Sequence, residues 1–232
     1  MQVYQGRASA DCALQGNDFL KFKTMAAKKN IKLVKKETEQ KVFNCVIVGT
    51  GGQGLITLLE ILSDAALKNG LDAKTSELHG LSQRGGSVEV HIKFGKKVFS
   101  PLVEAKKADL IVGLEMQECL KAAYFSGPQT QYLINKTEVA IPGKPLLAEE
   151  EIIGNLKKFT KKIEVIDAAG ICQKELGTAA VSGVYLLCVA AFKKMIPLVP
   201  ETMLEAIKSS VAPKHLDVNV KAWELAKKFT EL

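Results

Sequence analysis

Hydrophobic and polar positions along the chain follow two patterns. Short apolar, β-branched runs, typical of buried strands, occur at residues 42–48, 108–114 and 163–167. Helical spacing or helix-forming composition marks the longer segments at residues 55–68, 116–125, 149–162, 177–194, 200–210 and 217–230. Strands that alternate with helices predict an α/β fold, namely a three-layer α/β/α Rossmann-like sandwich with a mostly parallel sheet.

Further strands are predicted at residues 72–78, 87–94 and 132–135. The first of these completes a strand–turn–helix–strand sequence that begins at residue 42, which is the pattern of a βαβ unit. Residues 87–94 alternate like a half-buried strand, and Gly95-Lys96 predicts a turn into a second strand at 97–99. The sheet is therefore expected to contain one antiparallel hairpin.

Residues 1–41 show neither period and are predicted to be a poorly ordered N-terminal extension of a domain at 42–232. Residues 1–24 precede Met25, which is followed by the pattern of a natural start, and are interpreted as an upstream extension. The alternative is a transit peptide, although Arg is almost absent. The formal net charge is +7, but residues 1–44 hold nine basic and only four acidic residues. The remainder is close to neutral, so the charge does not favour nucleic-acid binding.

The cysteines form no ligand pattern, because no two are closer than sixteen residues. An odd count without pattern is typical of a reducing compartment, and a cytoplasmic location is expected. Cys45 and Cys188 lie in apolar runs and are expected to be inert core thiols. No apolar run reaches the roughly 18 residues of a membrane-spanning helix.

The strongest local motif is a glycine loop between a strand and a helix. Its residues are Gly49, Thr50, Gly51, Gly52, Gln53 and Gly54. Such glycines permit a sharp turn and close approach of a ligand, and the following helix N-terminus favours a phosphate or carboxylate. Glu77 stands where a dinucleotide fold has its ribose-binding acid. The alternative is a tight connection whose glycines serve packing alone.

A second polar loop at residues 77–87 concentrates several chemical groups. Its candidate residues are Glu77, His79, Gln83, Arg84, Gly85 and Gly86. Both loops are expected at the carboxyl edge of the sheet, where α/β proteins bind ligands. Arg84 is suited to a bidentate grip on a phosphate or carboxylate, and His79 to hydrogen bonding near neutral pH. The alternative is a loop held by its own hydrogen bonds, with Arg84 paired to Glu77 or to a partner subunit.

The two loops in this order resemble the gamma-type domain of the 2-oxoacid:ferredoxin oxidoreductases, and within that family the beta subunits of indolepyruvate:ferredoxin oxidoreductases. Ser100-Pro-Leu, the run 108–115, the helix after Gly177 and the stretch 219–225 also match, so the resemblance covers about residues 43–229. One departure concerns the helix after Gly177, where such subunits usually carry two Asn residues. Here Thr178 and Ser182 take those places, which puts ligand contacts from that helix in doubt.

The resemblance implies a small subunit of a heteromeric enzyme that decarboxylates an aryl 2-oxoacid, namely indolepyruvate, on thiamine diphosphate with magnesium. The complex passes electrons through iron–sulfur clusters to ferredoxin and transfers the acyl group to coenzyme A. The chain itself lacks clustered cysteines and a thiamine-diphosphate motif, so we expect it to bind none of these cofactors alone, to be inactive alone, and to complete a larger alpha subunit. No catalytic residue and no metal ligand are assigned to it.

Alternative functions are a stand-alone Rossmann protein that binds NAD or FAD, a subunit of a pyruvate or 2-oxoglutarate enzyme, and a non-catalytic scaffold. His91 and His215 have no second ligand at metal spacing and are expected to be core or solvated. The lysine-rich stretch 157–162 is interpreted as a solvated face, with a docking surface for acidic ferredoxin as the alternative.

Overall fold

The computed structural model describes residues 42–80, 86–139 and 146–231. The predicted N-terminal extension, residues 1–41, lies outside this part of the chain. Within the described residues, no helix combines the length and the apolar character needed to cross a membrane.

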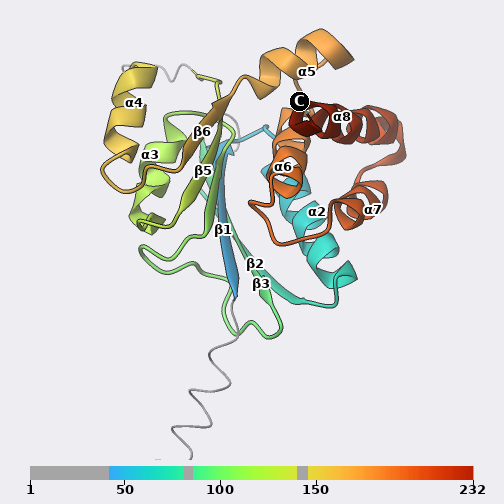
Figure 1. Ribbon diagram of the computed structural model, residues 1–232, viewed down its shortest axis with the longest axis horizontal. Helices are drawn as coiled ribbons and strands as arrows, with labels where there is room; N and C mark the ends of the chain where they lie inside the picture. The colour runs from blue at the N-terminus through green and yellow to red at the C-terminus, as the bar shows by residue number, and fades with distance from the viewer. Residues whose placement is uncertain (1–41, 81–85, 140–145, 232) are drawn as a thin grey trace, which may run out of the picture. The chain divides into compact units, whose positions relative to one another are not determined.

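A six-stranded mixed sheet forms the centre of the fold, with strand order β2-β3-β1-β4-β5-β6 (Figure 1). The strands are β1 (Phe43–Thr50), β2 (Asp72–His79), β3 (Ser87–Gly95), β4 (Leu110–Gly113), β5 (Gln131–Asn135) and β6 (Ile163–Ile166). Strands β1, β4, β5 and β6 are parallel, whereas β3 pairs antiparallel with both β1 and β2. The predicted α/β class with a mostly parallel sheet is confirmed.

Helices cover both faces of this sheet (Figure 1). They are α2 (Leu55–Lys68), α3 (Glu118–Ala122), the 3₁₀ turn η1 (Ala123–Phe125), α4 (Glu149–Leu156), α5 (Ala168–Leu176), α6 (Ser182–Phe192), α7 (Pro200–Ser210) and α8 (Pro213–Glu231). One apolar cluster joins the sheet to α2 and α5–α8, and a second joins it to α3 and α4. These two clusters are the two cores expected of a three-layer sandwich.

The sheet contains an antiparallel hairpin, as expected, but not the one predicted between residues 87–94 and 97–99. Residues 97–99 form no strand; β3 pairs instead with the preceding strand, β2, with Asp72 opposite Gly95 and His79 opposite Val88. Because β3 lies between β1 and β2, these two strands are not neighbours, and the expected βαβ unit is split. The cause is the short connection after β2, which allows only an antiparallel return.

Two helix predictions also need correction. The helix predicted over 149–162 ends at Leu156. Turns follow it, in which, for example, the Lys158 amide donates to the Asn155 carbonyl. The helix predicted from Gly177 begins only at Ser182, because Gly177, with φ 76°, is instead the left-handed C-cap of α5. Helix α5 was not predicted; its N-cap is Asp167, whose carboxylate accepts the Gly170 amide at 2.9 Å.

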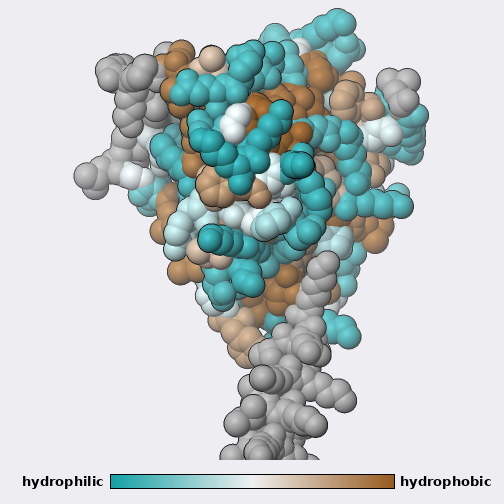
Figure 2. Space-filling model, turned by 60° about the vertical axis from the view of Figure 1, so that its left-hand side comes forward, coloured by the Kyte–Doolittle hydropathy of each residue, from teal (hydrophilic) through white to brown (hydrophobic). Residues whose placement is uncertain are grey.

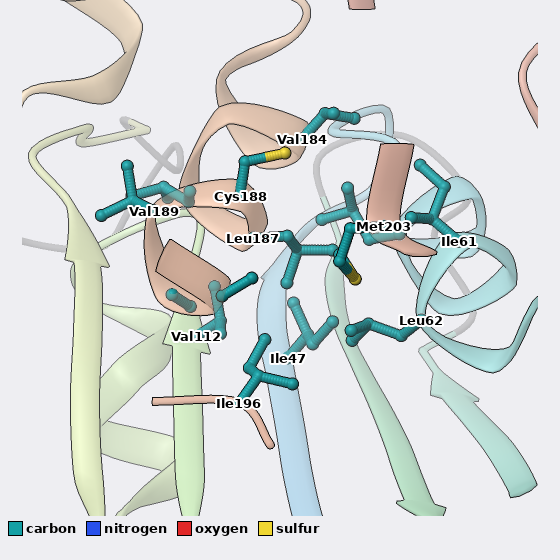
Figure 3. Packing of buried hydrophobic residues seen from close by; sticks show 14 of the residues in the cluster. Ile47, Ile61, Leu62, Val112, Val184, Leu187, Cys188, Val189, Ile196 and Met203 are labelled. Atoms are coloured by element: carbon teal, nitrogen blue, oxygen red, sulfur yellow. The ribbon is translucent and has the colours of Figure 1, made fainter. Parts of the chain in front are cut away.

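The larger core forms between the sheet and α6, which is buried on all sides from Gly183 to Ala191. Figure 3 shows Ile47 and Val112 of the sheet directed toward Leu187 of α6. Cys45 and Cys188 are buried, as expected of core thiols. Hydrophilic residues cover most of the side seen in Figure 2, and its hydrophobic residues form separate patches.

Candidate functional site

The glycine loop joins the carboxyl end of β1 to α2. Gly52 and Gly54 have φ of +100° and +76°, in the left-handed region that L side chains rarely adopt. A Cβ at either position would meet nothing within 4 Å, so the backbone conformation, and not packing, selects glycine there. Gly54 is the N-cap of α2 and has no side chain to accept the first helical amides, which leaves these donors for other acceptors.

Gln53 has a structural role in this loop. Its Oε1 accepts the Thr50 amide at 2.8 Å, and its Nε2 donates to the Leu114 carbonyl at 3.4 Å. The side chain therefore ties the loop to the end of β4. A Cβ on Gly49 would lie 2.5 Å from Gln53 Oε1, so glycine at position 49 makes room for this brace. The sequence predicted a binding residue, but both polar atoms of the Gln53 side chain already have partners within the protein.

The two predicted loops meet at one edge of the sheet. The Gly51 amide donates to the Gly86 carbonyl at 2.8 Å, and Thr50 lies opposite Ser87 in the β1–β3 register. Gln83, Arg84 and Gly85 lie outside the described residues.

Glu77 and His79 are exposed on the edge strand β2, two strands away from β1. A ribose-binding acid would stand on the strand next to β1, so the dinucleotide interpretation of Glu77 does not fit this topology.

A pocket of about 460 Å³ opens beside the glycine loop. Its polar lining residues are Gln53, Thr57, Thr178, Ser210, His215 and Asn219, and its other lining residues include Gly54 and Gly183. The structure thus brings Thr178, a candidate site residue on the segment whose ligand contacts the sequence put in doubt, to the same pocket as the glycine loop.

The first turns of α2, α6 and α8 all reach this pocket, through Thr57, Gly183 and His215. The amides of Ser182 and His215 are already bonded to Ala179 O and Ala212 O, so the attraction from α6 and α8 is that of the helix dipole. Each helix start carries a partial positive charge, and the pocket therefore suits an anionic group. Asn219 is 6% exposed, and its Nδ2 donates to the His215 carbonyl at 2.8 Å.

Sequence reasoning missed Thr57, Ser210 and Asn219 as lining residues and expected His215 to be a core or solvated residue. His215 is exposed and also lines the pocket. The polar residues at the start of α8 were the feature of the sequence that could have indicated these lining residues. Nothing in the sequence, however, places that helix against the glycine loop.

Two buried carboxyl groups lie at the adjoining end of β4. Glu118 accepts hydrogen bonds from the Ser87 hydroxyl and from Lys121 Nζ, the latter at 2.6 Å. Glu115 accepts the Glu118 amide at 2.8 Å, and burial raises the pKa of its carboxyl group. The contact with Ser87 fixes the first residue of β3, which directly follows Gly86. The sequence did not indicate this role.

No group of three or more His, Cys, Asp or Glu side chains in the described ranges is arranged to hold a metal ion. His91 is a core residue, as one of the expected alternatives stated: it is 1% exposed, accepts the Val103 amide on Nδ1 at 3.0 Å and contacts Glu89 through Nε2 at 2.7 Å. Burial raises the pKa of Cys172 to about 11, and it raises the pKa of Cys45, Cys119 and Cys188 further.

Comparison with solved structures defines the class of fold. The pyruvate oxidoreductase subunit PORC of Thermotoga maritima superposes with a TM-score of 0.62 at 19% identity, over 82% of this chain and 97% of that one. The 2-oxoglutarate:ferredoxin oxidoreductase of Magnetococcus marinus, solved with 2-oxoglutarate, coenzyme A and succinyl-CoA, gives a TM-score of 0.63 at 15% identity, over 83% of this chain and 32% of that longer one. The fold is that of the α/β subunit or domain found in these enzymes.

Comparison of sequences identifies the family. The family described as pyruvate ferredoxin/flavodoxin oxidoreductase matches residues 44–229. The indolepyruvate oxidoreductase subunit IorB of Archaeoglobus fulgidus is 36% identical over 187 residues, which cover 78% of this chain and 92% of the relative. The chain belongs to the pyruvate ferredoxin/flavodoxin oxidoreductase family.

Proposed function

We propose that this chain is the small subunit of a heteromeric indolepyruvate oxidoreductase, which oxidatively decarboxylates aryl 2-oxoacids to aryl-acetyl-CoA. The observation that carries this proposal is the identity of 36% to an indolepyruvate oxidoreductase subunit across nearly all of that relative. The alternative pyruvate or 2-oxoglutarate substrates would be selected around the reacting carbon. That centre is proposed to lie in the larger subunit.

The proposed division of labour follows from the cysteines. Iron–sulfur clusters need several thiolates within a short reach, and the five cysteines of this chain are widely spaced. Burial also raises the pKa of all four described thiols, which disfavours the thiolate that a cluster requires. Thiamine diphosphate, magnesium and the clusters therefore belong to a large alpha subunit, and ferredoxin accepts the electrons from the complex. We place this assembly in the cytoplasm.

The pocket beside the glycine loop is proposed to receive a phosphate of coenzyme A, the anionic co-substrate of the reaction. Support comes from the three helix starts on its wall and from the open space over Gly52 and Gly54. Thr57 and Thr178 would donate hydrogen bonds, and Arg84 of the adjoining loop would supply the charge. In this proposal the chain binds and orients coenzyme A and performs no redox step.

Reconstitution tests the proposal. The purified chain is mixed with its large partner subunit, and acceptor reduction is measured with indolepyruvate, phenylpyruvate, pyruvate and 2-oxoglutarate in turn. We expect a stable complex with the highest kcat/KM for an aryl 2-oxoacid. A complex that prefers pyruvate or 2-oxoglutarate would contradict the substrate assignment, and failure to form a complex would contradict the subunit role.

The coenzyme A contact has its own test in the same complex. Arg84→Ala should raise the KM for coenzyme A and leave the KM for the 2-oxoacid near its original value. Lys228→Ala, far along α8, is the matched loss of one positive charge. An unchanged KM for coenzyme A in Arg84→Ala would refute the phosphate grip.

A further inference from the structure

A lysine-rich groove lies at the amino ends of the parallel strands, at the end of the sheet opposite the glycine loop. Two adjoining hollows of about 680 Å³ and 540 Å³ share Gln131, Lys162 and Met195. Phe43 begins β1 and Gly95 ends the antiparallel β3, so the groove follows the amino ends of the parallel strands. It is therefore separate from the pocket described above.

Positive charge dominates this groove. Its charged lining residues are Lys96, Lys161, Lys162, Lys193 and Lys194, against Asp109 and Glu164. Both carboxylates have partners, because Asp109 accepts the amide and the side chain of Asn44 and Glu164 pairs with Lys193.

Apart from Lys193, the groove lysines form no ion pair with a carboxylate among the described residues. All five side chains are exposed. Within the described part of the chain, the groove thus carries positive charge that no carboxylate compensates.

Lys194 occupies a position where glycine would be easier to accommodate. Helix α6 ends with the Lys194 amide bonded to Ala191 O at 3.0 Å and the Met195 amide bonded to Ala190 O at 2.8 Å. These are the two bonds of a Schellman motif, whose left-handed position is usually glycine. Lys194 holds that position with φ 57°. A lysine thus occupies a position that strains the backbone, and it lines the groove.

The composition of the groove fits a transient protein partner. Its apolar floor is formed by Phe43, Phe94 and Met195, all less than 9% exposed, so little apolar surface is offered to a permanent subunit. Lysine is depleted from permanent interfaces, whereas small, charged surfaces are typical of weak encounters between redox proteins. The two aromatic rings are buried in the core, which leaves them unable to stack on nucleic-acid bases.

We propose that this groove is a docking surface for an acidic electron-carrier protein, which the lysines attract and orient. The inference rests on the proposed function, since the complex must have an acceptor to reduce. It adds that the small subunit, which holds no redox centre in this account, takes part in recognising that acceptor. Electrostatic complementarity of this kind acts mainly on the rate of association and makes it sensitive to salt.

The test uses the reconstituted complex with an acidic ferredoxin as the probe. Lys162→Glu combined with Lys194→Glu should raise the KM for ferredoxin about tenfold at low salt and flatten its salt dependence. Turnover with methyl viologen as acceptor should stay unchanged, which shows that the complex is folded and that the proposed oxidoreductase function holds. The matched control is Lys214→Glu with Lys228→Glu on α8, two lysines without a described ion pair, and should leave the KM for ferredoxin unchanged.

A second variant separates docking from folding. Lys194→Gly relieves the left-handed strain while it removes one charge, so the chain should melt at or above the original temperature and still show a KM for ferredoxin raised roughly two- to fivefold. An unchanged KM in both groove variants would overturn the proposal. An equal rise in the α8 control, or failure of the groove variants to bind the large subunit, would also overturn it.

Discussion

The brace formed by Gln53 predicts a measurable loss of stability when its side chain is removed. Gln53→Ala deletes the acceptor for the Thr50 amide, which lies 2.8 Å away on a residue only 3% exposed, and the donor to the Leu114 carbonyl. Leaving a buried backbone group without a partner costs about 1–3 kcal/mol. For a domain of this size each kcal/mol lowers the melting temperature by about 2–4 °C. We therefore expect a melting temperature roughly 2–12 °C lower.

Calorimetry and urea unfolding of the isolated chain measure this loss. The matched control is Gln173→Ala, because the Gln173 side chain also donates to a backbone carbonyl, that of Gly177 at 3.2 Å, but on the exposed surface of α5. Its unfolding free energy should change by less than about 0.5 kcal/mol. A Gln53→Ala chain as stable as the original would refute the brace and return Gln53 to the residues free to bind a ligand.

Three further predictions follow from buried groups. Gly113→Ala places a Cβ 2.1 Å from Cys119 Sγ and should cost about 1–3 kcal/mol of stability. Gly154→Ala, at an exposed position of α4 with open space around it, should be neutral or stabilising. Equal stabilities of the two variants in urea unfolding would contradict this. Burial raises the pKa of Glu115 above 4.5, so the folded state keeps a proton that the unfolded chain has lost. The stability of the fold therefore falls as the pH rises from the pKa of the unfolded chain through that of the folded state. Glu115→Gln should therefore gain stability relative to the original chain between about pH 4 and about pH 7, and a constant difference in unfolding free energy across that interval would count against the assignment. A Cys12→Ser chain should show no thiol reaction with Ellman's reagent while folded and four thiols after unfolding, since the four described cysteines are buried.

The sequence predicted all six strands of the sheet to within two or three residues, because each is a distinct apolar or alternating run between turn residues. It misplaced the pairing of β3, since the pattern of a half-buried strand is the same whichever neighbour provides the hydrogen bonds. It also missed α5, a helix of nine residues in which only Ala168 and Cys172 are buried, because so short a segment shows too little of a helical period.

The candidate site was predictable where neighbouring residues in the chain share one loop. The meeting of the glycine loop with the loop before β3 followed from the direction of the strands and is confirmed by the Gly51–Gly86 hydrogen bond. The pocket wall formed by Ser210, His215 and Asn219 was not predictable, because it depends on how α7 packs against α2 and how α8 packs against α6. No local pattern records that long-range contact.

The dependence of turnover on this chain tests the central claim most directly. The rate of ferredoxin reduction by the large subunit, with indolepyruvate and coenzyme A present, is measured while the small chain is titrated in. The account predicts no turnover by the small chain alone and a rate that rises to saturation at a fixed subunit ratio. Reduction of ferredoxin by the small chain alone, or a full rate from the large subunit without it, would contradict the account.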